Sequence, residues 1–336
     1  MKILFIGGTG TISMAITKKL LATNNELYLL NRGNRNDNLR GVNIIKTDIN
    51  NEKEVYDIIK DMQFDVVADF IAFNLEHVKR DYRLFNGRTK QYIFISSASA
   101  YQKPVENYII KEETPLINPY WEYSTNKAKC EEYLMKKYHE EGFPVTIIRP
   151  SHTYDERKVP LGIHGKKGSF QVVQRMLMGK PVLINGDGTS LWTMTHNSDF
   201  AEGFIGIMND KAVGEAFHIT SDESLTWNQI YKYIAKALNV EFKPYYVTSS
   251  FLSDFNDYEG SLIGDKSNTV VFDNSKIKKF VPSFKAKVNF EEGIKRTIDY
   301  VLKHKEFQVL DPDFDELCDS IISSIEGAKE NVKCQK

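Results

Sequence analysis

Short apolar runs and helical stripes alternate through the first half of the chain. The apolar runs predict strands at residues 3–6, 26–30, 42–45, 66–71, 91–95 and 145–148. Between them, apolar residues recur at helical spacing and predict helices at residues 11–23, 52–62, 75–85 and 123–141. A regular alternation of buried strands and helices predicts an α/β fold, in which a doubly wound parallel sheet carries helices on both faces.

The pattern loosens after Pro150. Residues 155–169 and 185–198 are rich in Gly, Lys, His and Thr, a composition typical of loops that face a substrate. Further helices are predicted near residues 227–238, 290–302 and 314–325, and the polar end at 327–336 is predicted to fray. We expect a nucleotide-binding domain over residues 1–150, completed by part of 195–222, and a smaller C-terminal α/β substrate lobe over 151–336.

The first predicted strand runs into a glycine-rich turn, Gly7-Gly8-Thr9-Gly10, before the first predicted helix. Gly7 can make the tight turn out of the strand, and Gly10 lets the backbone approach a pyrophosphate closely. The N–H groups at the start of the following helix then bind the phosphates. Ser13 stands where a third glycine is usual, and its small side chain still allows the helix to pack closely on the strand. The turn therefore predicts a Rossmann-type domain that binds a dinucleotide.

Hydroxyl side chains follow the predicted strand at 91–95, in the run Ser96-Ser97-Ala98-Ser99. Ligands of doubly wound sheets bind outside the carboxyl ends of the strands, so we expect these hydroxyls at the cleft. Tyr123 and Lys127 lie four residues apart on a predicted helix and therefore share one face. Because a nearby ammonium favours the phenolate form of tyrosine, Tyr123 could act as general base or acid on a substrate hydroxyl or carbonyl, with Ser97 bonded to the same oxygen.

The Tyr-x-x-x-Lys spacing alone is unspecific, because Tyr56, Tyr133 and Tyr154 also have a lysine four residues on. For those three tyrosines we expect a solvated helix face or loop. Tyr123 differs because it opens a helix one loop after the serine-rich strand end. Context therefore selects Tyr123 as the candidate for catalysis.

These segments, together with the run Arg149-Pro150-Ser151-His152-Thr153-Tyr154, resemble the extended short-chain dehydrogenase/reductase superfamily. Within it, the chain is similar to the NAD-dependent epimerase/dehydratase family of the UDP-galactose 4-epimerases, from Met1 to about residue 300. The resemblance implies catalytic roles for Ser97, Tyr123 and Lys127, the last also bonding the nicotinamide ribose, and an adenine contact at Asp48. The implied cofactor site comprises Gly7, Thr9, Gly10, Thr11, Ile12, Asn31, Arg32, Asp48, Ile49, Ile71, Ala72, Tyr123, Lys127 and Ser151.

The end of the second predicted strand departs from the NAD-specific members of this family, which carry Asp where this chain has Asn31. An acidic residue there bonds the adenosine ribose and repels a 2′-phosphate, whereas an arginine offers a bidentate phosphate clamp. Asn31 and Arg32, with Arg35 nearby, therefore favour NADP(H) as the NAD(P) cofactor, unless Arg32 stacks on adenine or faces solvent.

The substrate anchor also departs from the family pattern. Trp192 stands where nucleotide-sugar enzymes of the family usually carry an arginine that pairs with a diphosphate, and His152 replaces a usual asparagine. Tryptophan cannot pair with a diphosphate but can stack on a sugar or a base. The predicted substrate contacts are Ser97, His152, Trp192 and His196, and the basic alternatives for a diphosphate are Arg157, Lys158, Lys166 and Lys167. Structural roles for His196 and His164, either of which could contact the substrate, and solvated positions for the basic residues stay open.

The net charge of −1 over 336 residues creates no field that would attract nucleic acid or a membrane surface. No apolar run approaches the roughly 18 residues that a membrane span needs, no signal peptide is visible, and Cys130, Cys318 and Cys334 have no metal-binding spacing. We expect a cytoplasmic enzyme with a sugar-like small-molecule substrate and no metal. The resemblance further implies a homodimer built on the helices near 75–87 and 123–141.

A second resemblance leaves an alternative open. Residues 69–74 and 31–33 are similar to the branch of the family that contains the chloroplast stem-loop-binding proteins, which share the fold and bind RNA. RNA binding needs a basic stripe with stacking aromatic residues, and the sequence offers only the short basic loop at 157–167. We therefore predict an epimerase, dehydratase or reductase, with an RNA-binding or regulatory protein as the alternative.

Overall fold

The computed structural model describes residues 1–33, 39–255 and 258–334, which divide into two compact units. Unit 1 contains Met1–Thr153, Thr193–Asp222 and Val271–Val288. Unit 2 contains Tyr154–Trp192, Glu223–Val270 and Asn289–Lys336. Each unit is therefore assembled from segments that are far apart in the sequence.

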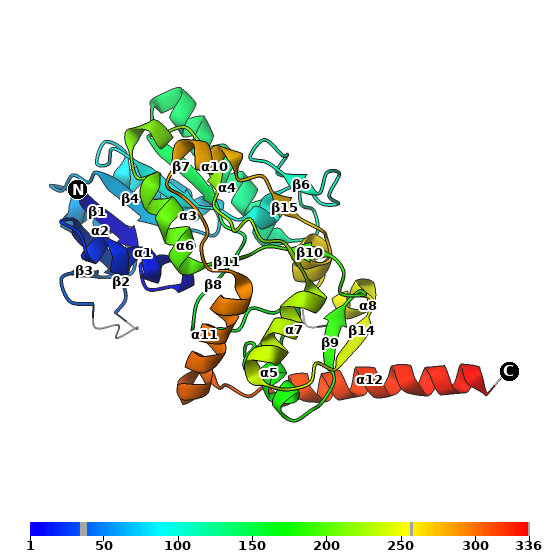
Figure 1. Ribbon diagram of the computed structural model, residues 1–336. Coiled ribbons are helices and arrows are strands. Elements are labelled where there is room, and N and C mark those ends of the chain that lie inside the picture. The colour runs from blue at the N-terminus through cyan, green and yellow to red at the C-terminus, as the bar shows by residue number, and fades with distance from the viewer. Residues whose placement is uncertain (34–38, 256–257, 335–336) are drawn as a thin grey trace. The chain divides into compact units, whose positions relative to one another are not determined.

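The described residues of unit 1 form a seven-stranded sheet in the order β12-β7-β5-β4-β1-β2-β3 (Figure 1). Its strands are β1 (Lys2–Ile6), β2 (Glu26–Asn31), β3 (Asn43–Lys46), β4 (Val66–Asp69), β5 (Tyr92–Ile95), β7 (Val145–Arg149) and β12 (Ala216–His218). All neighbouring strands are parallel, and the direction of winding reverses between β1 and β4. The predicted doubly wound parallel sheet is thus confirmed, and the reversal is where such sheets bind ligands.

Helices cover both faces of this sheet (Figure 1). The face under α1 (Thr11–Leu21), α6 (Asn197–Gly206) and α10 (Ser275–Phe280) has a core to which β1 contributes Ile3 and Phe5. The face under α2 (Glu52–Ile59), α3 (Leu75–Phe85) and α4 (Glu122–Glu141) receives Leu4 and Ile6 of the same strand. Since successive side chains of a strand point to opposite faces, a continuous apolar run is what a strand buried on both sides requires.

Short elements complete unit 1. They are η1 (Ala98–Ala100), β6 (Ile109–Ile110), β8 (His152–Tyr154, whose last residue belongs to unit 2), β11 (Met194–His196), η2 (Asp210–Ala212) and β15 (Val271–Phe272). β4 ends at Asp69, two residues before the predicted end, because its carboxylate accepts the backbone N–H of Ile71 and turns the chain (2.6 Å).

Unit 2 is a smaller α/β arrangement with two short strand pairs. Its elements are α5 (Phe170–Leu177), β9 (Val182–Asn185), β10 (Leu191–Trp192), β13 (Leu225–Thr226), α7 (Trp227–Leu238), β14 (Pro244–Val247), α8 (Ser249–Ser253), α9 (Tyr258–Ser261), the π-helix η3 (Leu262–Lys266), α11 (Phe290–Lys303), η4 (Lys305–Phe307) and α12 (Pro312–Lys333). β9 pairs with β14 in parallel and β10 with β13 in antiparallel orientation. The predicted helices near 227–238 and 290–302 are confirmed as α7 and α11.

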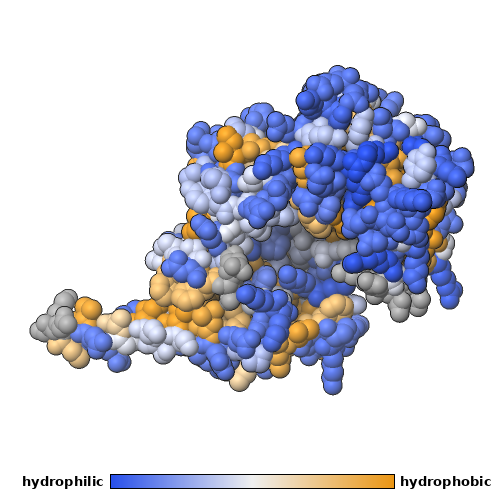
Figure 2. Space-filling view, turned by 180° about the vertical axis from the view of Figure 1, so that it is seen from behind, coloured by the Kyte–Doolittle hydropathy of each residue, from blue (hydrophilic) through white to orange (hydrophobic). Residues whose placement is uncertain are grey.

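The C-terminal helix α12 corrects one prediction. It continues to Lys333, so the expected fraying from residue 327 onward is wrong for the described part. In its first half, the side chains of Phe314, Cys318 and Ile321 are buried. Side-chain pairs such as Glu326 with Lys329 (2.7 Å) stabilise the polar second half. That half extends beyond the rest of unit 2 as a rod on which apolar and polar side chains lie side by side (Figures 1 and 2). Neither α12 nor another helix in the described ranges is long and apolar enough to cross a bilayer.

Candidate functional site

The glycine turn follows β1 directly. Gly7 and Gly8 adopt positive φ angles of 101° and 93°, a backbone conformation that favours glycine. A Cβ on Gly8 would lie 2.5 Å from Leu29 Cδ2, so strand β2 packs against the turn where only glycine fits. Gly10 caps α1 without a side chain, and Ser13 Oγ accepts the Gly10 N–H (2.9 Å). The next N–H groups of α1 thus have no side-chain cap, which suits them to an anion.

A cavity of about 470 Å³ opens beside this turn, at the carboxyl ends of β1 to β4. We call it the strand-end cavity. It is lined by Gly7, Gly8, Thr9, Gly10, Ser13, Leu30, Asn31, Arg32, Gly33, Thr47, Asp48, Ile49, Asn50, Phe70, Ile71, Phe73, His77 and Arg80. All of these residues belong to unit 1. The cavity therefore occupies the point where the strand order of the sheet reverses.

Eight of the fourteen residues predicted for the cofactor site line this cavity. They are Gly7, Thr9, Gly10, Asn31, Arg32, Asp48, Ile49 and Ile71, whereas Thr11, Ile12, Ala72, Tyr123, Lys127 and Ser151 do not line it. Sequence reasoning missed the cavity residues Thr47, Asn50, Phe73, His77 and Arg80. His77 and Arg80 lie on α3, and no sequence motif marks their side chains as part of a binding site. Their positions relative to β3 and β4 depend on how the helix packs.

Polar side chains line the cavity at the ends of β2 and β3, and two of them, Arg32 and Thr47, have no hydrogen-bond partner among the described residues. Asn31 Oδ1 accepts the Gly33 N–H (2.8 Å), which turns the chain after β2. Arg32 is exposed and makes no hydrogen bond or ion pair with the described residues. Thr47 is 7% exposed, yet its hydroxyl has no hydrogen-bond partner in the described chain. A buried hydroxyl without a partner is costly, which favours a ligand that satisfies it. Arg35 lies outside the described residues.

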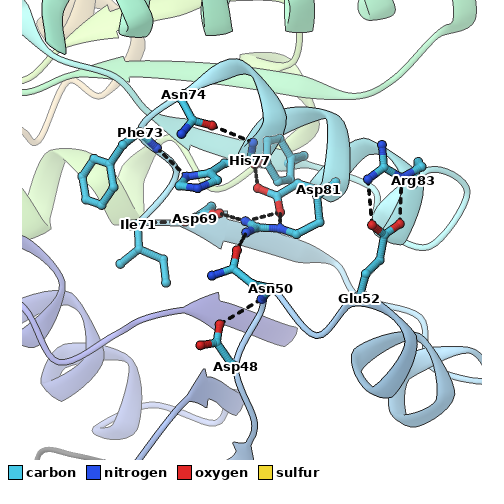
Figure 3. A network of polar contacts seen from close by, with 12 residues as sticks. Asp48, Asn50, Glu52, Asp69, Ile71, Phe73, Asn74, His77, Asp81 and Arg83 are labelled. Carbon is cyan, nitrogen blue, oxygen red and sulfur yellow. Dashed lines mark hydrogen bonds and ion pairs between the residues drawn. The ribbon is translucent and has the colours of Figure 1, made fainter. Parts of the chain in front are cut away.

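A buried charged network supports the wall formed by residues 69–74 (Figure 3). The Arg80 guanidinium donates to Asp81 Oδ1 through Nε (2.9 Å) and Nη2 (2.7 Å) and lies 3.4 Å from Asp69 Oδ2. Tyr92 donates to the other oxygen of Asp81 (2.6 Å). Burial, and then the neighbouring Asp81, raise the pKa of Asp69 well above its usual value. One arginine therefore holds two buried carboxyl groups at the base of the cavity.

His77 fixes the same wall from α3. Its Nδ1 accepts the Phe73 N–H (3.1 Å), while Asn74 caps α3 by accepting the His77 N–H (3.1 Å). Burial, and then the Arg80 cation, lower the pKa of His77, so the ring is neutral near pH 7. Because Nδ1 accepts, the neutral ring carries its proton on Nε2.

Lys127 reaches the ends of β4 and β5 from α4. Its buried ammonium donates to the carbonyl oxygens of Ala72 and Ile95, both at 2.6 Å, and lies 5.7 Å from the centre of the Tyr123 ring. Burial lowers the pKa of Lys127 to about 8. The Lys127 cation therefore stands beside the predicted phenol. Lys137 lies at the same distance from Tyr133, but it pairs with Glu141 on the surface.

Three serine hydroxyls form a chain at the end of β5. Ser97 Oγ accepts the Ser99 N–H (3.2 Å) and lies 2.9 Å from Ser99 Oγ. Ser124, the residue after Tyr123, donates to Ser99 Oγ (2.8 Å). This chain connects the predicted Ser97 to the first turn of α4, where the half-buried Tyr123 lies.

The predicted substrate residues are held by their own surroundings. Trp192 is 3% exposed and stacks on Trp227, with ring centres 5.5 Å apart. His196 is buried at the start of α6, where its Nδ1 accepts the Ser198 N–H (3.3 Å). His152 is half-buried in β8. Arg157 pairs with Asp155 at 2.6 Å. Their contacts with a substrate stay predictions.

The fold and the strand-end cavity define a protein of the Rossmann type. The model of the NAD dependent epimerase/dehydratase family matches residues 3–220, and the chain belongs to this family, which confirms the resemblance seen in the sequence.

Three similar proteins illustrate the range of this family. A trifunctional UDP-glucose 4,6-dehydratase/UDP-4-keto-6-deoxy-D-glucose 3,5-epimerase/UDP-4-keto-L-rhamnose-reductase of Arabidopsis thaliana is 24% identical over 234 residues, covering 69% of this chain and 32% of the relative. The chloroplast stem-loop binding protein of 41 kDa b from the same plant is 26% identical over 252 residues, covering 70% and 63%. This chain thus spans less than two thirds of either relative.

Among solved structures, the dTDP-glucose 4,6-dehydratase of Bacillus anthracis in complex with NAD has a TM-score of 0.73 and 20% identity. The match covers 91% of this chain and 98% of that chain, and it confirms the fold.

Proposed function

We propose that this protein is an NAD(P)-dependent enzyme that acts on a hydroxyl or carbonyl carbon of a sugar or nucleotide-sugar-like substrate. The net reaction is an epimerisation, a dehydration or a reduction. The observation that carries the proposal is the arrangement at the end of β5. There Ser97 is connected through Ser99 to Ser124, the residue after Tyr123, and Lys127 of the same helix donates to the Ile95 carbonyl oxygen. This cluster belongs to the same unit as the strand-end cavity.

The strand-end cavity fits a dinucleotide. A Cβ on Gly7 would approach Ile71 Cγ2 to 3.3 Å, so the turn is kept clear for a close backbone approach. The uncapped N–H groups of α1 suit a pyrophosphate, and the unpartnered Thr47 hydroxyl suits a polar ligand. We assign the pyrophosphate to the turn at Gly7–Gly10, the adenosine half to Asp48, Ile49 and Ile71, and the nicotinamide half to Ala72, Tyr123, Lys127 and Ser151. A bound nicotinamide supplies a hydride acceptor and donor beside the substrate carbon.

The three candidate catalytic residues have separate tasks in this proposal. The Tyr123 phenol takes up and returns the proton of the substrate oxygen. Ser99 Oγ accepts from Ser124 (2.8 Å) and can donate its own proton to Ser97 Oγ (2.9 Å), so the Ser97 proton is left to donate to the substrate oxygen. The Lys127 ammonium favours the phenolate form of Tyr123 by its charge and holds the nicotinamide ribose. His152, Trp192 and His196 remain candidate substrate contacts, and the packing described above favours structural roles for Trp192 and His196.

We further propose that NADP(H) is preferred over NAD(H). Support comes from the exposed Arg32, which has no acidic partner within the described ranges, beside Asn31 in place of an acidic residue. Lys46 adds a second cation: its side chain lies along Gly33, where a Cβ would be 3.0 Å from Lys46 Cε. Within the described part of the chain neither Arg32, after β2, nor Lys46, at the end of β3, has an acidic partner, and two such cations suit a 2′-phosphate.

We also propose a homodimer formed through α3 and α4. A groove of about 550 Å³ follows the surface of α4 and is lined by apolar residues such as Ile117, Ala128 and Met135. Ile117 is among the exposed large apolar side chains of the chain. Sedimentation at two protein concentrations tests the dimer.

The experiment that tests the proposed function begins with the purified protein. Denaturation should release NAD(P) if the enzyme is an epimerase or dehydratase, which keep the cofactor, whereas an exchanging reductase should release little. The protein is then incubated with UDP-glucose, UDP-galactose and dTDP-glucose, and the sugar is followed by NMR. Conversion of one of them supports the proposal. Failure to bind either dinucleotide, with RNA co-purifying instead, would overturn it in favour of the alternative RNA-binding role.

A further inference from the structure

Asp69 ends β4 and shapes the turn that follows the strand. Its side chain is fully buried, and Oδ1 accepts the Ile71 N–H at 2.6 Å (Figure 3). One residue later, the Ala72 carbonyl oxygen accepts a hydrogen bond from Lys127 Nζ (2.6 Å). The Asp69 carboxyl group therefore helps to place one of the two acceptors that hold the Lys127 ammonium, the other being the Ile95 carbonyl oxygen at the end of β5 (2.6 Å).

Asp69 also belongs to a balanced set of buried charges. Arg80 Nη2 lies 2.7 Å from Asp81 Oδ1 and 3.4 Å from Asp69 Oδ2, and both carboxyl groups are 0% exposed. Lys127, which is 2% exposed, is the second cation of this set. Buried charges are stable only when they are compensated. Because Arg80 is closer to Asp81, the Asp69 carboxylate is left to compensate Lys127.

The electrostatic surroundings of Lys127 point to the same carboxylate. Burial lowers the pKa of Lys127 to about 8, and Asp69 is the largest influence that raises it. Of the two further groups that raise this pKa, Cys130 is itself neutral, because burial raises the pKa of its thiol to about 12, and Glu131 is bound to Arg149 (2.7 Å). The other titratable or charged groups around Lys127 and Asp69 are Tyr123 on α4 and His77, Arg80 and Asp81 on α3.

We infer that Asp69 is a positioning residue for the proposed reaction, whose carboxylate is the counter-charge that keeps the Lys127 ammonium beside the candidate phenol of Tyr123. The inference rests on the proposed roles of Lys127 and Tyr123. Asp69 does not line the strand-end cavity, so it acts through Lys127. An ammonium carries three protons, and the two carbonyl oxygens accept two of them, which leaves the third for a ligand.

Nuclear magnetic resonance of the full chain, carrying isotope-labelled lysine, follows the titration of Lys127 and needs no substrate. Lys127→Met identifies the signal. We expect a wild-type midpoint near pH 8 and a midpoint about one pH unit lower in Asp69→Asn. The asparagine keeps an oxygen for the Ile71 N–H and removes only the charge. An unchanged midpoint in Asp69→Asn would overturn the inference.

The matched control is Asp65→Asn, at the opposite end of β4. Asp65 also accepts a backbone N–H, that of Lys2 (2.8 Å), but it pairs with Lys90 on the surface. The Lys127 midpoint in this variant should equal that of the wild type. A midpoint lowered as far as in Asp69→Asn would overturn the inference, because any loss of a carboxylate from β4 would then have the same effect.

Urea unfolding at pH 7 provides a second measurement, which also applies if Asp69→Asn folds poorly. The loss of stability caused by Asp69→Asn should be smaller in the Lys127→Met background, where no ammonium is left without its counter-charge. Equal losses in the two backgrounds would overturn the inference. A lowered midpoint in Asp69→Asn combined with wild-type turnover in Lys127→Met would overturn the proposed role of Lys127 instead, so the two failures are distinguishable.

Discussion

The sequence places polar and aromatic candidate residues both in the strand-end cavity and in the segment 186–199, but the fold gives partners mainly to those in the segment. In the cavity, Arg32 and the Thr47 hydroxyl have no partner among the described residues. In the segment 186–199, Trp192 is stacked on Trp227 and His196 caps α6. Asp199 accepts the backbone N–H groups of Lys287 (2.9 Å) and Val288 (2.8 Å).

The two regions differ in whether the fold already uses their polar and aromatic side chains. A polar or aromatic side chain that the fold already uses for a cap or a stack loses that contact when it turns to a ligand. A buried hydroxyl or a cation left without a partner gains from binding. Substitutions near the cavity should therefore alter binding or turnover, and also stability where they strain the glycine turn or remove the buried Lys127 ammonium, whereas substitutions in the segment 186–199 should act mainly on stability.

The largest effect is expected at Tyr123. Tyr123→Phe removes the phenolic proton carrier and should lower kcat by about 10²- to 10⁴-fold, while the affinity for the dinucleotide changes little. Turnover of the accepted sugar and cofactor titration measure the two effects. Tyr133→Phe is the control and should keep full turnover. Tyr133 also has a lysine four residues on, Lys137, but this lysine pairs with Glu141 on the surface. Wild-type turnover in Tyr123→Phe would remove this residue from the mechanism.

Next in size is the glycine turn. Gly8→Ala combines a positive φ with a Cβ 2.5 Å from Leu29, and it should lower the free energy of unfolding by about 3 kcal/mol. Urea unfolding measures the change. Gly327→Ala is the matched control: it lies in α12 with open space around its Cβ, and it should stabilise the protein by about 1 kcal/mol. Equal effects of the two substitutions would mean that the turn carries no strain.

The stability of the protein should depend on pH through Lys127. Burial lowers its pKa to about 8 in the folded protein, below the ordinary 10.5, so between these values the unfolded chain binds more protons. Wild-type stability relative to Lys127→Met should therefore rise with pH, by about 2 kcal/mol between pH 7.5 and 9.5. Urea unfolding without cofactor measures this, and the exposed Lys129→Met serves as control. Parallel pH curves for wild type and Lys127→Met would show that the ammonium is not desolvated.

A smaller effect is expected at Arg32. Arg32→Ala should weaken NADPH binding by about 10-fold and NADH binding much less, because only NADPH carries the 2′-phosphate. Fluorescence titration with both dinucleotides measures the ratio, and the effect should shrink at high salt. Equal losses for the two would contradict the phosphate clamp and leave Arg32 as an adenine or surface contact.

The smallest effect on turnover should come from Trp192. Trp192→Phe keeps a ring against Trp227, so we expect kcat and KM within about threefold of wild type and a loss of stability of about 1 kcal/mol. Steady-state kinetics and urea unfolding measure the two. A drop of two orders of magnitude in kcat/KM at wild-type stability would contradict a purely structural role for Trp192, because it would show that the stacked ring also contacts the substrate.

Most of unit 1 could be predicted from local sequence. Continuous apolar runs such as Leu4–Ile6 predict a strand that is buried on both faces. The glycine turn comes directly after the first of these runs in the chain. The helical end of the chain could not be predicted. Residues 327–333 lack an apolar stripe, and α12 continues through them on side-chain pairs and on helix already formed by the buried Phe314 and Cys318.

Local stretches of sequence were enough to predict the doubly wound sheet, the glycine turn and the candidate residues Ser97, Tyr123 and Lys127, because each depends on a short segment whose spacing matches one element. The contact between Arg80 and Asn50 in the cavity wall and the stacking of Trp192 on Trp227 depend instead on how the folded chain packs. Residues thirty or more positions apart meet through the packing of helices on a sheet, and no local pattern records which of their polar groups that packing leaves without a partner.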